Sequence, residues 1–228
     1  MTGKSNWWSR FFYTISGRNV VDKIESKHNG RVEIVREFGK YRIVTGNITQ
    51  SGSPVALVWK KAVEQLAKII KRGNGKRILI LGLGGGTLAG MLSGRFYGVE
   101  LIGVEIDREM VKMGKKYLRL TEINNLNVVI DDAVGYCKKA FLEKESFDAI
   151  FVDLYRGHRV PSETDSEDFF KSVVDLLAPD GLMFVNRLYF DSESRMAAEK
   201  TINEIEKVGS GKINLIRTYT NLVIAVSG

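Results

Sequence analysis

The chain has 228 residues, of which 44% are hydrophobic and 27% are charged, a composition that excludes a disordered chain. No apolar run approaches the ~20 residues that a helix needs to cross a bilayer, and the aromatic stretch at residues 1–17 lacks the features of a signal peptide. The single cysteine, Cys137, excludes an internal disulfide, and we expect a cytoplasmic protein.

Basic residues are concentrated in the first third of the chain. Residues 1–80 hold 16 Lys and Arg against 5 Asp and Glu, whereas residues 81–228 hold 18 against 22. A basic region of this kind suits an anionic partner such as nucleic acid, a membrane surface or another subunit. Because no stacking aromatics interleave these residues in an RNA-binding pattern, solvated charges on a hairpin and a helix are the favoured interpretation.

A β-hairpin and a helix are the first predicted elements. Residues 31–37 and 41–45 alternate apolar and polar side chains on either side of a turn that contains Gly39. Residues 55–70 then carry apolar side chains at helical spacing, after Pro54, which suits a first helical turn. We therefore expect a small N-terminal β-hairpin module followed by a linking helix.

A domain boundary is predicted where this helix ends. The stretch at residues 71–75 contains two glycines and an asparagine, which interrupt the helical pattern. We therefore divide the chain into two units. Residues 1–73 hold the aromatic segment, the hairpin module and the linking helix, and residues 74–228 form an α/β domain.

Short apolar runs alternate with amphipathic stretches from Arg77 onward. Continuous apolar runs of this length are typical of parallel strands that helices cover on both faces. The predicted strands are residues 78–81, 101–105, 128–130, 147–153 and 182–186. The predicted helices between and after them are residues 108–118, 134–142, 165–177 and 193–207. A turn is expected at residues 178–181, before the fifth strand.

The chain closes with two further strand-like runs, residues 213–219 and 222–226, which only Thr220-Asn221 separates. So short a link cannot hold a crossover helix, and the two strands must therefore be antiparallel neighbours. The predicted fold class is α/β: a Rossmann-like, doubly wound sheet that ends in an antiparallel hairpin.

A glycine loop follows the first predicted strand of the α/β domain. Gly82, Gly84, Gly85 and Gly86 let the backbone turn sharply and let a ligand approach the main chain. The helix after the loop begins with unpaired N–H groups. The second strand ends at Glu105, where a carboxylate accepts hydrogen bonds from both hydroxyls of a ribose. Loop, strand and acidic residue together predict a site for an adenosyl nucleoside.

Two ligands that contain adenosine compete for this site. The spacing of Gly84, Gly86 and Ala89 also satisfies a looser dinucleotide fingerprint, so NAD stays an alternative. The antiparallel C-terminal hairpin, a feature of the class I methyltransferase type of sheet, favours an adenosyl-sulfonium ligand. Asp132, which precedes Ala133 at the end of the third strand, is placed to meet the adenine amino group. The alternative role of Asp132 is a helix N-cap, and one side chain can serve both purposes.

These motifs resemble the spermidine synthase-like (polyamine aminopropyltransferase-like) branch of the class I S-adenosylmethionine-dependent methyltransferase-fold proteins. The hairpin that leads to Gln50 resembles the small N-terminal β module of that family. The matching pieces are Gly84-Gly85-Gly86, Val104-Glu105-Ile106-Asp107, Asp131-Asp132-Ala133, Phe147-Asp148-Ala149-Ile150-Phe151-Val152-Asp153, Val160-Pro161, Glu167-Asp168-Phe169-Phe170, Leu177-Ala178-Pro179-Asp180-Gly181 and Asn186.

The resemblance implies a cofactor, a set of ligand contacts and an assembly. It implies that S-adenosylmethionine or its decarboxylated form is bound, that Asp153 is catalytic and faces the acceptor, and that the protein is a homodimer. The residues expected on the cofactor side are Gln50, Gly82, Gly84, Gly85, Gly86, Glu105, Asp132 and Ala133. No metal is expected, because two histidines and one cysteine show no metal-ligand spacing.

Several positions depart from the family's pattern, and every change except that of the tyrosine removes negative charge or adds positive charge. Thr87 stands where an aspartate usually follows the glycine loop, and Arg156 stands where a second aspartate follows the fourth strand. The acidic pair, tyrosine, histidine and glutamate expected after Gln50 are replaced, without gaps, by Val55, Ala56, Trp59, Lys60 and Lys61. Repulsion between such cations and an ammonium group costs on the order of 1 kcal/mol at close range, which disfavours a diamine acceptor.

Three functions stay open. The favoured one is methyl transfer to a neutral or acidic small acceptor, which Asp153 would orient or deprotonate unless it only caps the loop that follows. Tyr155, Arg156 and His158 are acceptor-side candidates in that loop, and His158 is either a base near neutral pH or merely exposed. The first alternative is aminopropyl transfer to an amine, with Asp153 as the general base. The second is a non-catalytic nucleoside-binding protein with a basic partner-binding face, for which nucleic acid is one partner.

Overall fold

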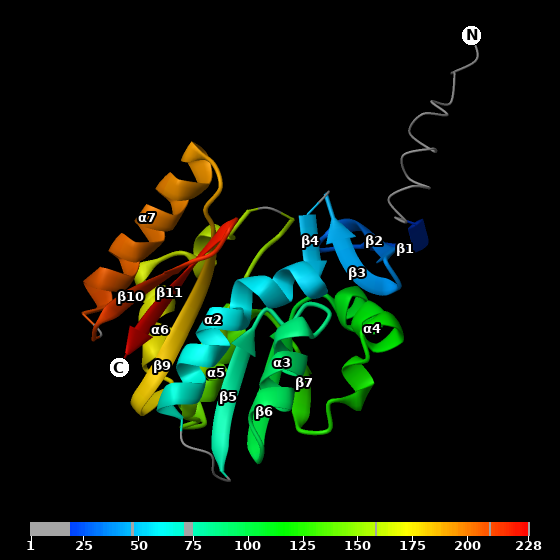
Figure 1. Ribbon diagram of the computed structural model, residues 1–228. Helices are drawn as coiled ribbons and strands as arrows, with labels where there is room; N and C mark the ends of the chain where they lie inside the picture. The colour runs from blue at the N-terminus through cyan, green and yellow to red at the C-terminus, as the bar shows by residue number, and fades with distance from the viewer. Residues whose placement is uncertain (1–18, 47, 71–74, 158, 210, 228) are drawn as a thin grey trace.

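The computed structural model describes residues 19–46, 48–70, 75–157, 159–209 and 211–227 (Figure 1). They form a four-stranded sheet of order β1-β2-β3-β4 and a seven-stranded sheet of order β10-β11-β9-β8-β5-β6-β7. The expectations about the aromatic start, the boundary at residue 73 and His158 fall outside the described residues. None of the helices in the described ranges is long and apolar enough to cross a membrane.

The small sheet is larger than the hairpin that was predicted. Its strands, each antiparallel to the next, are β1 (Asn19–Ser26), β2 (Gly30–Glu37), β3 (Lys40–Thr45) and β4 (Ile48–Ser51). The predicted hairpin is β2–β3, and it turns at Phe38 and Gly39, both of which have positive φ. β1 and β4 were not expected. Alternation along β2 and β3 buries one apolar face against α4 (Arg108–Tyr117).

The large sheet has the predicted topology. Its parallel strands are β5 (Lys76–Leu81), β6 (Val99–Glu105), β7 (Leu126–Ile130), β8 (Phe147–Val152) and β9 (Leu177–Leu188). The last two strands are β10 (Ile213–Arg217) and β11 (Asn221–Ser227). β11 lies between β9 and β10 and is antiparallel to both, which confirms the C-terminal antiparallel hairpin.

The turn expected at residues 178–181 is instead part of β9. The pairing of β8 with β9 shifts register between Phe147 and Ala149, and Asp180 has a φ of 62°. The residues that suggested a turn therefore form an irregularity inside a longer strand, which resumes regular pairing at Leu182.

Helices cover both faces of the large sheet, as continuous apolar strands require. One face packs against α2 (Ser53–Ile69) and α3 (Thr87–Arg95), and the other packs against α5 (Ala133–Leu142), α6 (Glu167–Val174) and α7 (Ser192–Val208). Short 3₁₀ turns lie at Leu120–Glu122 and Ser162–Thr164. α6 is shorter than predicted because Ser166 caps its start and β9 already begins at Leu177.

The small sheet contacts the glycine loop through its last strand and the start of α2. Ser51 Oγ accepts a hydrogen bond from Gly85 N (2.7 Å), and Thr87 Oγ1 accepts one from Gly52 N (2.7 Å). Figure 1 shows the small sheet beside α4, at the end of the large sheet toward which β5 points. The N-terminal module is thereby attached to the edge of the sheet at which α/β proteins bind ligands.

Candidate functional site

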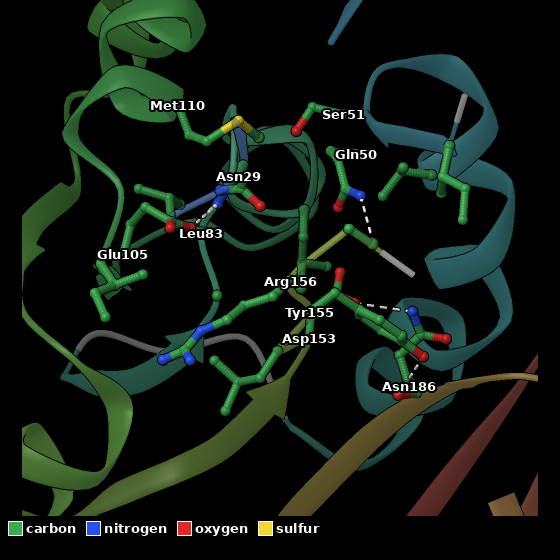
Figure 2. A pocket seen from close by; sticks show the side chains of 18 of the residues that line it. Asn29, Gln50, Ser51, Leu83, Glu105, Met110, Asp153, Tyr155, Arg156 and Asn186 are labelled. Carbon is green, nitrogen blue, oxygen red and sulfur yellow. Dashed lines mark hydrogen bonds between the residues drawn. The ribbon is translucent and has the colours of Figure 1, made fainter. Parts of the chain in front are cut away.

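A cavity of ≈ 360 Å³ lies at the carboxyl ends of the parallel strands (Figure 2). This volume is within the range of small-molecule sites. The strand order reverses here between β5 and β8, which is the position of ligand sites in doubly wound sheets. Both sheets contribute to the lining. Figure 2 shows Glu105 and Asn29 on one side of the cavity and Asp153, Tyr155 and Asn186 on the other.

Most of the predicted site residues line this cavity. Those on the cofactor side are Gln50, Gly82, Gly84, Glu105, Asp132 and Ala133. Those on the acceptor side are Asp153, Tyr155 and Arg156. Gly85 and Gly86 are not in the described lining, and a Cβ at either would press on a side chain, Ile43 or Leu120 respectively. A side chain at either position would therefore force one of these packed side chains to shift, and Gly86 also has a φ of 88°.

Close packing of the glycine loop requires a further glycine on the helix that lies against it. Gly114 lies on α4, and a Cβ there would stand 2.7 Å from the carbonyl oxygen of Gly85. The helix can approach the loop this closely only because residue 114 has no side chain. Gly82, with a φ of 91°, is constrained in another way, because a Cβ there would overlap the carbonyl of Asp153.

We expect Gly114→Ala to lower the free energy of unfolding by about 1–3 kcal/mol, because overlap with the loop backbone outweighs the better helix propensity of alanine. Nucleoside affinity should fall with it, since the loop is displaced. Gly94→Ala in α3 is the matched control: a Cβ there meets nothing, so we expect about 0.5–1 kcal/mol of added stability. Denaturant unfolding measures both, and equal stability of the two variants would contradict the packing role.

Glu105 connects the loop to the end of β6. Its Oε2 accepts a hydrogen bond from Gly84 N (2.7 Å) and its Oε1 accepts one from Asp107 N (3.0 Å). Each oxygen retains a further lone pair, so the carboxylate can also accept from ribose hydroxyls. The side chain is 8% exposed, and burial raises the pKa of Glu105 to about 7, although both backbone donors oppose the shift.

Asp132 is the N-cap of α5. Its Oδ1 accepts a hydrogen bond from Gly135 N (2.9 Å), so the capping role is confirmed. The same residue lines the cavity beside Ala133. Contact with an adenine amino group stays a prediction, and the cap leaves room for it because a carboxylate has about four acceptor positions.

Asp153 follows β8 and is held from two other elements. Asn186 Nδ2 on β9 donates to Asp153 Oδ1 (2.9 Å), and Trp59 Nε1 on α2 donates to Asp153 Oδ2 (3.1 Å). Burial raises the pKa of the Asp153 carboxyl, while these two donors and the charge of Arg187 lower it. Within the described hydrogen bonds the side chain caps no N–H of its own loop, and it lines the cavity.

The other acceptor-side candidates already have partners. The Tyr155 hydroxyl donates to the backbone oxygen of Asn186 (3.3 Å) and accepts from Leu188 N (2.8 Å). Arg156 forms an ion pair with Glu163 (3.4 Å), which neutralises part of the charge it would offer to an acidic acceptor.

Gln50, on the cofactor side, also has partners. Its Nε2 donates to Thr45 Oγ1 and to Gly157 O, both at 2.9 Å, and so joins the small sheet to the loop after β8.

Two asparagines are among the cavity residues that the sequence did not predict. Asn29 lies in the β1–β2 turn and its Nδ2 donates to Asp107 Oδ2 (2.6 Å), and Asn221 begins β11. An Asn-Gly pair at residues 29–30 is a turn signal that could have indicated the β1–β2 hairpin. No pattern along the chain indicates that either asparagine reaches the cavity. Among the described residues no group of His, Cys, Asp and Glu side chains could hold a metal ion.

Comparisons with known proteins bear on this site. The family model described as Spermine/spermidine synthase domain matches residues 58–227. The chain is 29% identical over 121 residues to a polyamine aminopropyltransferase of Vibrio vulnificus (strain CMCP6), over 53% of this chain and 40% of the relative. It is 28% identical over 144 residues to an eEF1A lysine and N-terminal methyltransferase homolog of Drosophila melanogaster, over 60% of this chain and 21% of the relative. The match thus spans less than half of either relative.

The fold has a counterpart among solved structures. A probable spermidine synthase from Corynebacterium glutamicum ATCC 13032 aligns with a TM-score of 0.75 at 17% sequence identity. The alignment covers 92% of this chain and 80% of that one. It therefore includes most of this chain, and at this sequence identity the likeness is one of fold.

Proposed function

This chain belongs to the Spermine/spermidine synthase domain family, and from that premise we propose that it transfers a methyl group from S-adenosylmethionine to an acceptor beside Asp153. The two relatives differ in the group they transfer according to their names, one being an aminopropyltransferase and the other a methyltransferase. The side chains around the cavity favour the second reaction.

The observation that carries this proposal is the charge of the acceptor side. Of the described carboxylates that line this side, Glu163 is paired with Arg156, so Asp153 is the one without a cationic partner within ion-pair distance. The cavity lining also includes uncharged polar side chains, such as Asn186 and Asn221, and the apolar side chains of Val55, Val58, Leu188 and Phe190. A diamine carries two ammonium groups and would leave one of them without a carboxylate, at a cost that grows as water is excluded. A neutral acceptor, such as a single uncharged amine, meets no such cost.

The donor side also favours the carboxylated donor. Thr87, which begins α3, lines the cavity, and its hydroxyl accepts from Gly52 N. No carboxylate is present at this position to hold the ammonium of an aminopropyl chain. The first N–H groups of a helix favour an anion, and S-adenosylmethionine has a carboxylate that its decarboxylated form lacks.

The residues present fit an adenosyl donor. Glu105 would hold the ribose, Asp132 the adenine amino group, and the glycine loop would allow close approach of the nucleoside. When bound, the donor supplies a methyl group whose bond to sulfur breaks as the acceptor atom bonds to carbon, with the electron pair staying on sulfur. Asp153 orients the acceptor and takes the proton that it loses.

The donor preference is testable at Thr87. We expect the wild-type protein to bind S-adenosylmethionine at least about tenfold more tightly than decarboxylated S-adenosylmethionine, and Thr87→Asp to reverse the preference. The new carboxylate repels the carboxylate of S-adenosylmethionine, whereas it only attracts the decarboxylated donor, which keeps the ammonium group and has no carboxylate. Thr121→Asp, which adds the same charge at an exposed position, should leave both affinities unchanged.

Calorimetry of both donors on the wild-type, Thr87→Asp and Thr121→Asp proteins measures the donor preference. A wild-type preference for the decarboxylated donor would overturn methyl transfer and support aminopropyl transfer. If neither donor binds, both transferase proposals fail. If S-adenosylmethionine binds, transfer of a labelled methyl group to monoamines and to diamines then tests the acceptor class, and diamines should be the poorer acceptors.

A further inference from the structure

A chain of hydrogen bonds leads to Asp153 from the C-terminal hairpin. Thr220 Oγ1 donates to Asn221 Oδ1 (2.6 Å), Asn221 Nδ2 donates to Asn186 Oδ1 (3.0 Å), and Asn186 Nδ2 donates to Asp153 Oδ1 (2.9 Å). Asn186 and Asn221 are each only 6% exposed. Every bond points toward the carboxylate, so the orientation of each amide determines that of the next.

The backbone at Asn186 is held independently of this chain. Its carbonyl oxygen accepts from Arg187 Nη1 (2.8 Å) and from the Tyr155 hydroxyl (3.3 Å). Arg187 is 2% exposed and is itself anchored to Asp165 Oδ1 (3.0 Å). With the backbone held in place, the remaining freedom of Asn186 is a flip of its side-chain amide, and Asn221 is the residue that contacts the amide oxygen.

We propose that Asn221 acts through Asn186 as a positioning residue, keeping an N–H of Asn186, and not its carbonyl oxygen, against the Asp153 carboxylate. This inference rests on the proposed function, in which ionised Asp153 accepts a proton from the acceptor. A carbonyl oxygen beside Asp153 would repel the carboxylate and stabilise the protonated acid, which can donate to that oxygen. The protonated acid cannot take a proton from the acceptor.

Among the described residues, few groups other than this relay set the charge state of Asp153. Arg187 on β9 carries a positive charge, which favours the ionised form of Asp153. Glu105 at the end of β6 carries a second carboxylate, and the charge of Asp153 raises the pKa of Glu105. α2 contributes the uncharged indole of Trp59, and the loop after β8 contributes the hydroxyl of Tyr155. Burial raises the pKa of Asp153, so a lost or reversed donor shifts that pKa upward.

Substitutions at Asn221 test the relay. Asn221→Leu removes the donor to Asn186. Asn221→Asp places a carboxylate there, which should attract the Asn186 N–H and so reverse its amide. We expect kcat at neutral pH to fall about tenfold in the first and further in the second, with the pH profile of transfer displaced to higher pH. Affinity for S-adenosylmethionine should stay within about twofold of wild type, because the relay lies on the acceptor side.

Asn214→Leu is the matched control, since Asn214 lies on β10 of the same hairpin and its amide contacts Gln65 on α2, away from the relay. Thr220→Val removes the first donor of the relay at an exposed position, so it is the variant to use if those at Asn221 do not fold. It should shift the profile in the same direction by a smaller amount.

Carboxyl NMR titration of Asp153 provides a readout that does not depend on turnover. A higher pKa of Asp153 in the Asn221 and Thr220 variants, with none in Asn214→Leu, supports the relay. An unchanged titration and pH profile overturns it, even where stability falls, because Asn221 would then be only structural. If the wild-type protein transfers no methyl group to any acceptor, the proposed function fails, and the titration still decides the relay.

Discussion

Glu105→Gln is expected to weaken binding of S-adenosylmethionine about 100-fold, because hydrogen bonds to a charged acceptor are worth about 1.5–3 kcal/mol each. Both carboxylate oxygens already accept from the backbone at Gly84 and Asp107. An amide would have to turn its NH₂ group toward one of these N–H donors. The variant therefore loses one hydrogen bond to the backbone in addition to the weakened hydrogen bonds to the ribose. Calorimetry on the two proteins measures the effect.

The affinity of the wild-type protein should also depend on pH. Burial raises the pKa of Glu105 to about 7, and only the ionised form accepts from both ribose hydroxyls without a competing proton. Affinity should therefore fall about tenfold per pH unit as the pH drops below 7. The glutamine variant does not titrate at this position, so its affinity should show no such slope.

The same raised pKa has the opposite effect on stability. Between the ordinary value of 4.5 and about 7, folded Glu105 keeps its proton whereas the unfolded chain has lost it. The folded state then binds more protons, so this contribution to the free energy of unfolding is full below pH 4.5 and decreases as the pH rises to about 7. Denaturant unfolding at several pH values measures this effect.

Glu100→Gln is the control for the binding experiments, because Glu100 lies on β6 with Glu105 but at the exposed amino end of the strand. A Glu105→Gln protein that binds S-adenosylmethionine as well as this control would contradict a ribose contact.

Asp153→Asn is expected to lower the rate of methyl transfer about 10³-fold, at the centre of the range for a general base, while donor affinity changes by no more than about threefold. The amide cannot take a proton from the acceptor. It must also point its NH₂ group at Asn186 or at Trp59, both of which are donors, and we expect a stability loss of about 1–3 kcal/mol.

Single-turnover kinetics with saturating donor measure the Asp153 effect directly. Asp148→Asn is the matched control, because Asp148 lies at the amino end of β8, the strand that Asp153 follows, and pairs there with Lys76. It should lose stability without loss of transfer. A rate for Asp153→Asn near that of Asp148→Asn would exclude Asp153 as the base and leave it a structural residue.

Much of the large sheet could be predicted because its signals are local. An apolar run buried on both faces, such as Leu101–Glu105, is identified without knowledge of its neighbours. The link predicted at Thr220-Asn221, which the structure places at residues 218–220, was short enough to require an antiparallel pair, because no crossover fits in it. The glycine loop and Glu105 have a spacing along the chain that matches their closeness in space, so this contact was accessible from sequence as well.

The partners of the functional side chains were not accessible in this way. Asp153 meets Trp59, which is 94 residues away in the chain, and Asn186, which is 33 residues away. Asn186 in turn meets Asn221, which is 35 residues further on. Nothing in the local pattern at either asparagine distinguishes a hydrogen-bonded relay from an ordinary strand end.

The amino-acid sequence by itself determined the fold class, a doubly wound sheet with an antiparallel C-terminal hairpin, and the glycine loop at which a nucleoside is predicted to bind, because hydrophobic periodicity and loop length act over a few residues. Only the tertiary structure decided which side chains surround Asp153, how the N-terminal sheet reaches the glycine loop, and that Arg156 is already paired. These contacts join residues from separate elements, and packing of the two sheets and their helices brings them within hydrogen-bond distance.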